Sequence, residues 1–68
     1  MTGHHSVPPG KRVIVWWHSG RVVVDRFVKE DRGIITLAKT GDVSARRLRH
    51  MTLYRGDRPL PVGTEKLA

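Results

Sequence analysis

Arginines are concentrated in the last third of the 68-residue sequence. Five of them fall between positions 46 and 58, with one aspartate as the only opposing charge: Arg46, Arg47, Arg49, Arg55 and Arg58. A guanidinium group offers its donors in a fork that matches two phosphate oxygens, which favours arginine over lysine at phosphate sites. The run therefore predicts a phosphate-binding surface. The competing interpretation is an ordinary solvated face.

The charge of the whole chain points to the same chemistry. Thirteen lysines and arginines against six aspartates and glutamates give a formal net charge of +7, and the sequence pI is about 11.2. So large a positive excess in a small domain favours a polyanionic partner, above all DNA or RNA. Binding through phosphates would show little sequence preference and a steep salt dependence, because it releases condensed counterions.

Two adjacent tryptophans, Trp16 and Trp17, provide a second chemical signal. Neighbours in a strand point to opposite faces of a sheet, so one indole packs in the core and the other does not. An exposed Trp16 beside Arg12 would be a stacking platform for an unpaired base. It would otherwise lie beneath the N-terminal arm, or join Ile14 in an apolar patch between copies of the chain. The predicted nucleic-acid-binding residues are Lys11, Arg12, Trp16, Arg21, Arg46, Arg47, Arg49 and Arg55.

Residues typical of catalytic or metal sites are sparse. His18, Asp25 and His50 do not form a recognisable triad, and the glycines are scattered singly at turns rather than gathered in a phosphate loop. The chain has no cysteine, and the adjacent His4 and His5 lack further ligands at a fixed spacing. We therefore predict that the protein is not an enzyme and uses no metal or cofactor.

Membrane and targeting signals are also lacking in this sequence. No apolar run approaches the ~20 residues of a membrane span, and no apolar stretch resembles a signal peptide. The lack of cysteine fits a reducing compartment. These features predict a cytoplasmic protein without membrane contact.

Short strands separated by turns would position these residues. Runs of β-branched and aromatic residues on both sides of His-Ser-Gly predict a hairpin, in which Gly20 supplies a positive φ. The strand before the turn would place Val13, Val15 and Trp17 on the interior face. Apolar residues on both faces of the next strand predict that it bends and joins two sheets, with a bulge near residues 25–26.

Five strands and one 3₁₀ turn are expected in the folded part of the chain. The expected elements are strands 11–17, 21–29, 34–39 and 43–45, a 3₁₀ turn within 46–50 pinned by Leu48, and a last strand 51–54. Residues 1–10 form a flexible N-terminal arm, 11–55 the domain, and 56–68 a loose C-terminal tail. Strands of this length and spacing predict an all-β barrel or small sandwich.

The order of these elements, with a 3₁₀ turn before the last strand, is similar to that of the SH3-like barrel. The stretch from Gly33 to Tyr54, GIITLAKTGDVSARRLRHMTLY, particularly resembles the second half of the DNA-binding SH3-like domain that closes retroviral integrases. This resemblance covers residues 11–55. It implies a small five-stranded SH3-like barrel that contacts DNA, by analogy of architecture.

Two other functions are compatible with an SH3-like chain of this size. The closer alternative is a small adaptor or regulatory factor of phage or mobile-element type that binds another protein. The remote alternative is the plasmid-borne, trimethoprim-insensitive dihydrofolate reductase, whose tetramer encloses one active pore. In that family a Val-Gln-Ile-Tyr segment lines the pore, whereas residues 42–46 here read Asp-Val-Ser-Ala-Arg.

Overall fold

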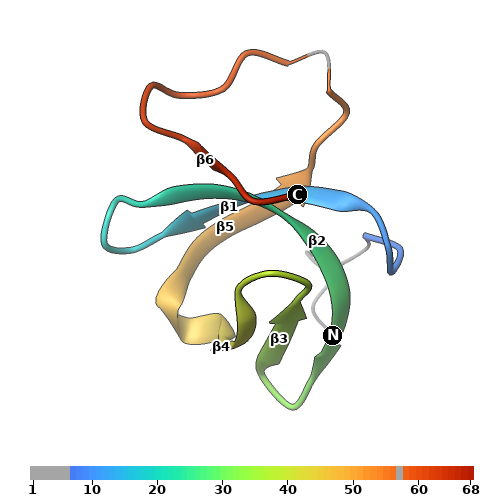
Figure 1. Cartoon of the computed structure of the whole chain (residues 1–68). Coiled ribbons are helices and arrows are strands. Elements are labelled where there is room, and N and C mark those ends of the chain that lie inside the picture. The colour runs from blue at the N-terminus through green and yellow to red at the C-terminus, as the bar shows by residue number, and fades with distance from the viewer. Residues whose placement is uncertain (1–6, 57) are drawn as a thin grey trace.

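The computed structural model describes residues 7–56 and 58–68, and nearly all its regular elements are strands (Figure 1). In chain order they are β1 (Arg12–Trp17), β2 (Val22–Asp31), β3 (Ile34–Leu37), β4 (Gly41–Ser44), the 3₁₀ turn η2 (Ala45–Arg47), β5 (Leu48–Leu53) and β6 (Glu65–Lys66). The predicted all-β class is confirmed. The described part of the chain contains no helix long and apolar enough to cross a membrane.

The first two strands form the antiparallel hairpin that the sequence predicts. Trp16 of β1 lies opposite Val22 of β2. Gly20 in the turn has a φ of 98°, a left-handed conformation that glycine adopts without steric cost. Its backbone N–H donates to the Trp17 carbonyl at 3.0 Å, which closes the turn.

The long strand β2 is shared by two parts of the sheet, as the apolar residues on both its faces predict. Its first half pairs with β1 and its second half with β3. The bulge expected near residues 25–26 lies further along, between Phe27 and Lys29. Asp25 and Arg26 stay in regular register with β1. The irregularity lies instead where the pairing of β2 with β1 ends and its pairing with β3 begins.

The strand order is β4-β3-β2-β1-β5, with all of these neighbours antiparallel. A sixth strand, β6, pairs in parallel with β2 at Val23 and Val24, on the edge that β3 leaves free. Among the described strands, no pairing joins β4 to β5. The observed architecture is therefore a curved, open sheet of six strands, in place of five strands closed into a barrel.

One face of the sheet carries the main hydrophobic core. Val13, Val15 and Trp17 are buried there, which confirms the predicted interior face of the first strand. Side chains from β2, β3, β4 and β5 complete this core. Val7, which precedes β1, packs against its margin.

The opposite face of β1 and β2, which we call the outer face, carries a smaller cluster. Ile14, Val24 and Tyr54 are buried in this outer cluster, and Trp16 packs against it while half-buried. Leu60 from the C-terminal segment covers part of it. Trp16 is thus the outward tryptophan, and Trp17 the core tryptophan.

The C-terminal segment differs from the loose tail that the sequence predicts. It leaves the end of β5, loops out and returns beside β2, where it contributes β6 (Figure 1). The Leu67 N–H donates to the Val24 carbonyl at 2.8 Å. The sequence conceals this strand because Glu65 and Lys66 form no apolar alternation, and their pairing depends on the free edge of β2.

The 3₁₀ turn is shorter than the segment 46–50 that the sequence assigns to it. Helical geometry covers Ala45–Arg47, and β5 begins at Leu48. Leu48 is buried and pairs with Trp17 of β1. The side chain that we expect to pin the turn therefore does so as the first residue of the following strand.

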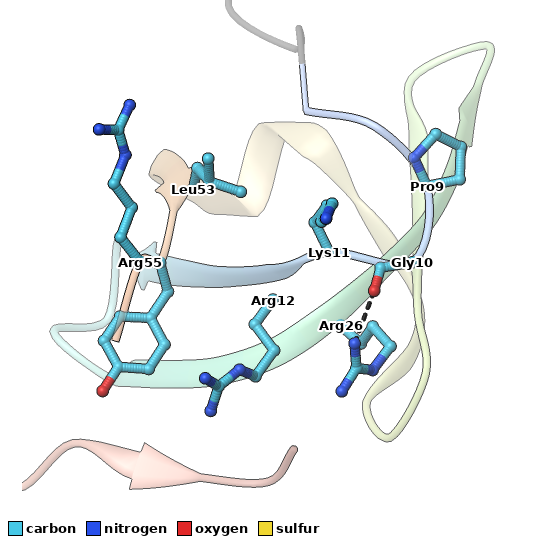
Figure 2. A pocket seen from close by; sticks show the side chains of 8 residues that line it. Pro9, Gly10, Lys11, Arg12, Arg26, Leu53 and Arg55 are labelled. Atoms are coloured by element: carbon cyan, nitrogen blue, oxygen red, sulfur yellow. Dashed lines mark hydrogen bonds between the residues drawn. The ribbon is translucent and has the colours of Figure 1, made fainter. Parts of the chain in front are cut away.

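The residues before β1 are attached to β2. The N–H of Gly10 donates to the Phe27 carbonyl at 2.7 Å, and Nη1 of Arg26 donates to the Gly10 carbonyl at 2.6 Å (Figure 2). These contacts fix the start of β1, so the described end of the predicted arm has a defined course. The histidine pair at positions 4 and 5 lies outside the described residues.

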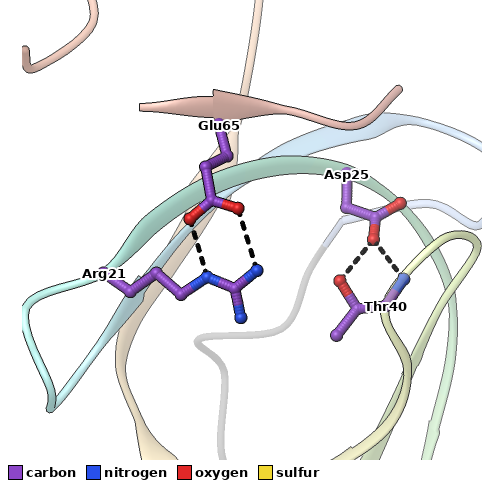
Figure 3. A network of polar contacts seen from close by, with 4 residues as sticks. All are labelled: Arg21, Asp25, Thr40 and Glu65. Carbon is purple, nitrogen blue, oxygen red and sulfur yellow. Dashed lines mark hydrogen bonds and ion pairs between the residues drawn. The ribbon is translucent and has the colours of Figure 1, made fainter. Parts of the chain in front are cut away.

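A fully buried carboxylate, that of Asp25, ties β2 to the connection between β3 and β4 (Figure 3). Its Oδ2 accepts the hydroxyl and the N–H of Thr40 at 2.6 and 2.7 Å. Its Oδ1 accepts the N–H groups of Lys39 and Arg26 at 3.0 and 2.7 Å. Burial alone would raise the pKa of Asp25, but these hydrogen bonds favour the charged form more strongly and hold the pKa below its ordinary value.

The charge of Asp25 should contribute to stability above a pH of about 3.9, the ordinary pKa of an aspartate. Because the folded-state pKa is lowered, that contribution is lost as the pH falls through the lowered value. We predict that Asp25→Asn, which turns an amide donor toward other donors, lowers the free energy of unfolding by about 2 kcal/mol or more near pH 7. Urea unfolding of both proteins from about pH 2 to about pH 7 measures the loss and its pH profile.

Thr40→Val is the milder companion variant, because it removes one hydroxyl hydrogen bond and keeps the carboxylate. It should cost about 1 kcal/mol and retain the acid dependence of the wild type. An Asp25→Asn protein with wild-type stability and pH profile would show that the network contributes nothing.

Candidate nucleic-acid interface

An open pocket of about 650 Å³ lies where the start of β1 meets the middle of β2 and the end of β5. Four cationic side chains line it: Lys11, Arg12, Arg26 and Arg55. None of its lining residues, all of them in the described part of the chain, carries a carboxylate. The pocket thus gathers positive charge in a concave surface, which attracts anions.

Arg12 and Arg26 are direct cross-strand partners. Their side chains extend to the same side of β1 (Figure 2). The Arg12 guanidinium lies 5.0 Å from the ring centroid of Tyr54, and Arg26 is held by the Gly10 carbonyl. Because an arginine has five N–H donors, these contacts leave donors on both side chains for an anion.

Lys11 and Arg55 form the rim of the pocket. Both are exposed, and in Figure 2 the Arg55 side chain extends to the other side of β1 from Arg12 and Arg26. They do not converge on the same point as the two inner arginines. They broaden the positive surface around the pocket instead.

A second concavity, of about 350 Å³, is lined by Trp16, Arg49 and His50. The ring centroids of Trp16 and His50 are 5.2 Å apart, with the planes tilted by 36°. Arg49 and His50 are exposed, and Trp16 is half-buried. We call this surface the aromatic groove.

Two further arginines are occupied by contacts around the core tryptophan. The guanidinium groups of Arg21 and Arg47 lie 5.7 and 5.2 Å from the Trp17 ring centroid. Arg21 also donates two hydrogen bonds to the Glu65 carboxylate, at 2.8 and 2.9 Å (Figure 3). These bonds and the opposite charges raise the pKa of Arg21 and lower that of Glu65. Arg21 is therefore less available to an external phosphate.

The eight predicted binding residues fall into separate places. Three line the pocket, two line the aromatic groove, two contact Trp17, and Arg46 is exposed on η2. The arginines at 46 and 47 precede β5, whereas Arg55 follows it. The six residues of β5, at a rise of ~3.3 Å each, separate them by roughly 20 Å or more, so the arginine run does not converge on one point.

The sequence analysis missed Arg26 and His50. Arg26 had a readable signal, because it and Arg12 stand at equal distances from Ser19 in the predicted turn. A hairpin centred there pairs them, as the structure shows. His50 had no such signal, since its alignment with Trp16 depends on the pairing of β1 with β5, two strands that are far apart in the sequence.

Nothing in residues 7–56 and 58–68 resembles a metal site, because no three His, Cys, Asp or Glu side chains gather closely enough to hold an ion. Asp25 is buried in its own hydrogen-bond network, whereas His18 is exposed in the hairpin turn. Comparisons with protein-family models, curated proteins and solved structures find no match. The pocket and the groove are therefore the basis for assigning a function.

Directly opposed arginines should make the unliganded protein sensitive to salt. Like charges at this spacing destabilise a sheet by roughly 0.2–1 kcal/mol, and counterions screen that repulsion. We predict that the melting temperature rises between ~10 and ~150 mM NaCl. The rise should be smaller in Arg26→Gln than in Lys29→Gln, which removes the same charge from β2 outside this pocket. Equal salt responses in the two variants would contradict repulsion between Arg12 and Arg26.

Proposed function

We propose that this protein binds nucleic acid through phosphate contacts at the pocket between Arg12 and Arg26. The observation that supports this most directly is the pairing of two arginines on adjacent strands, in a concavity whose lining residues include no carboxylate. Such a pair weakens an isolated sheet. Local arrangements that cost stability are expected at functional sites, where a ligand compensates for them.

The chemistry of the pocket suits a phosphodiester. Each guanidinium can donate two parallel hydrogen bonds to one phosphate, and a bound phosphate would neutralise the repulsion between the two side chains. Lys11 and Arg55 on the rim would attract the neighbouring phosphates. Contacts of this kind position a strand without reading its bases, so we expect little sequence preference.

We also propose that this open sheet has the strand arrangement of the SH3-like family, without the closure of a full barrel. Two features support the assignment: β2 is shared between the β1–β5 part and the β3–β4 part of the sheet, and η2 precedes β5. An experimental structure would test it. The assignment would be wrong if the strand order differed from β4-β3-β2-β1-β5.

The binding proposal predicts a defined change in salt dependence. Fluorescence anisotropy with duplex DNA, single-stranded DNA and hairpin RNA measures the affinity between ~50 and ~200 mM salt. Log affinity falls with log salt, and Arg12→Gln/Arg26→Gln should make this negative slope shallower by about 1.8 for the duplex, since each lost phosphate contact contributes about 0.9. The weakening should be similar for different sequences, because the contacts are to the backbone.

Lys29→Gln/Lys39→Gln is the matched control, because it removes two exposed charges that do not line the pocket. It should change the slope much less. Equal losses in both double variants would mean that net charge matters and the pocket does not. Absence of affinity for all three nucleic acids at ~50 mM salt would overturn the proposal and favour the protein-binding adaptor.

A further inference from the structure

The aromatic groove combines one outward aromatic ring with cationic and polar side chains. Trp16 comes from β1, and Arg49 and His50 come from the neighbouring strand β5. Part of the indole packs on the outer cluster, while the groove leaves another part accessible. A ring held in this way presents a flat surface that loses little conformational freedom when a ligand stacks on it.

A register shift between β1 and β5 creates this surface. Trp16 pairs with His50 but Trp17 pairs with Leu48, so Arg49 is the extra residue on β5. In a regular strand Arg49 and His50 would point to opposite faces. Here both are exposed, whereas Leu48 and Met51 on either side of them are buried. Irregularities of this type are enriched beside functional sites, where they redirect a side chain.

We propose that the aromatic groove stacks an unpaired base of a single-stranded nucleic acid, an inference that rests on the proposed phosphate binding. Every base has a π face, so an exposed tryptophan can stack any of them. Arg49 would donate to the base edge or to the adjoining phosphate. In a duplex the bases are stacked on one another, so only an unpaired base offers its face to Trp16.

The groove and the pocket lie on the same face of β1. Arg12 and Trp16 are four residues apart, which corresponds to roughly 13 Å along the strand. Ile14 and Val24 occupy the row between them, and Leu60 packs on this part of the outer cluster. The stacking surface is therefore separate from the phosphate-binding pair, so variants can change one without the other.

Single-stranded and duplex DNA of ~12 nucleotides per strand distinguish stacking from phosphate binding. Wild-type protein should bind the single strand with quenching of tryptophan fluorescence, because the base lies on Trp16. Trp16→Leu, which keeps an apolar side chain on the outer cluster, should weaken single-strand binding by about 5- to 100-fold and abolish the quenching. Its affinity for the duplex should stay unchanged.

Arg49→Gln tests the same surface without altering the outer cluster. Arg49 is exposed on β5, so the fold should tolerate the change, and thermal unfolding checks both variants. Arg49→Gln should weaken single-strand binding more than Lys29→Gln, which removes an equal charge elsewhere on the sheet. If Trp16→Leu does not fold, this comparison and the quenching of the wild type decide the question.

The outcomes separate the two proposals. Two outcomes would overturn the stacking site and leave the phosphate-binding proposal intact. One is duplex binding by a wild type whose tryptophan fluorescence the single strand does not quench. The other is an equal loss of single-strand and duplex affinity in Trp16→Leu. Failure of the wild type to bind either DNA would overturn both. Unchanged single-strand affinity in Trp16→Leu, with sedimentation showing that a wild-type dimer has become a monomer, would identify the groove as a contact between copies of the chain.

Discussion

The position of the proposed binding surface depends on the buried carboxylate of Asp25. Asp25 has no exposed surface, yet it holds the connection between β3 and β4 through the backbone of Lys39 and Thr40. It also accepts the N–H of Arg26, whose carbonyl accepts the N–H of Ala38 at 2.9 Å. The backbone of Arg26 is therefore fixed on both sides. An ionised group in the interior is tolerated because hydrogen-bond donors surround it.

The register of β2, β1 and β5 sorts the chemistry of the outer face into rows. The rows are Arg26–Arg12, Val24–Ile14–Thr52 and Val22–Trp16–His50. Charge is concentrated in the first row and aromatic surface in the last. The middle row is apolar except for Thr52 and is shielded in part by Leu60. One twisted sheet thus provides two chemically different surfaces, because the pleat brings every second residue of each strand to the same face.

The local sequence pattern was sufficient to predict the β1–β2 hairpin and the interior face of β1. Alternating apolar residues on both sides of Gly20 define β1 and β2 and place Val13, Val15 and Trp17 on one face, because strand periodicity and turn chemistry act over a few residues. The same reasoning left the choice of the outward tryptophan open. That choice depends on which face of β1 the rest of the sheet covers, which is a property of the whole fold.

Features that depend on pairing between distant parts of the chain could not be predicted from the sequence. Glu65 and Lys66 carry no apolar signal, and Asp25 looks in sequence like any strand aspartate beside an arginine. The aromatic groove requires the shifted register of β5, which follows from the burial of both Leu48 and Met51. The candidate site was therefore predicted in its chemistry, as arginine and tryptophan, but its geometry came from tertiary contacts.

The parallel pairing of β6 also bears on the order of assembly. The hairpins close loops of only a few residues, whereas the pairing of β6 with Val23 and Val24 closes a loop of about forty residues. The longer loop costs about 2 kcal/mol more in loop-closure entropy. We expect a contact with that cost and only two paired residues to form late in folding and to open before the rest of the sheet. Brief release of the segment would uncover Ile14 and Val24, which lie between the two proposed binding surfaces.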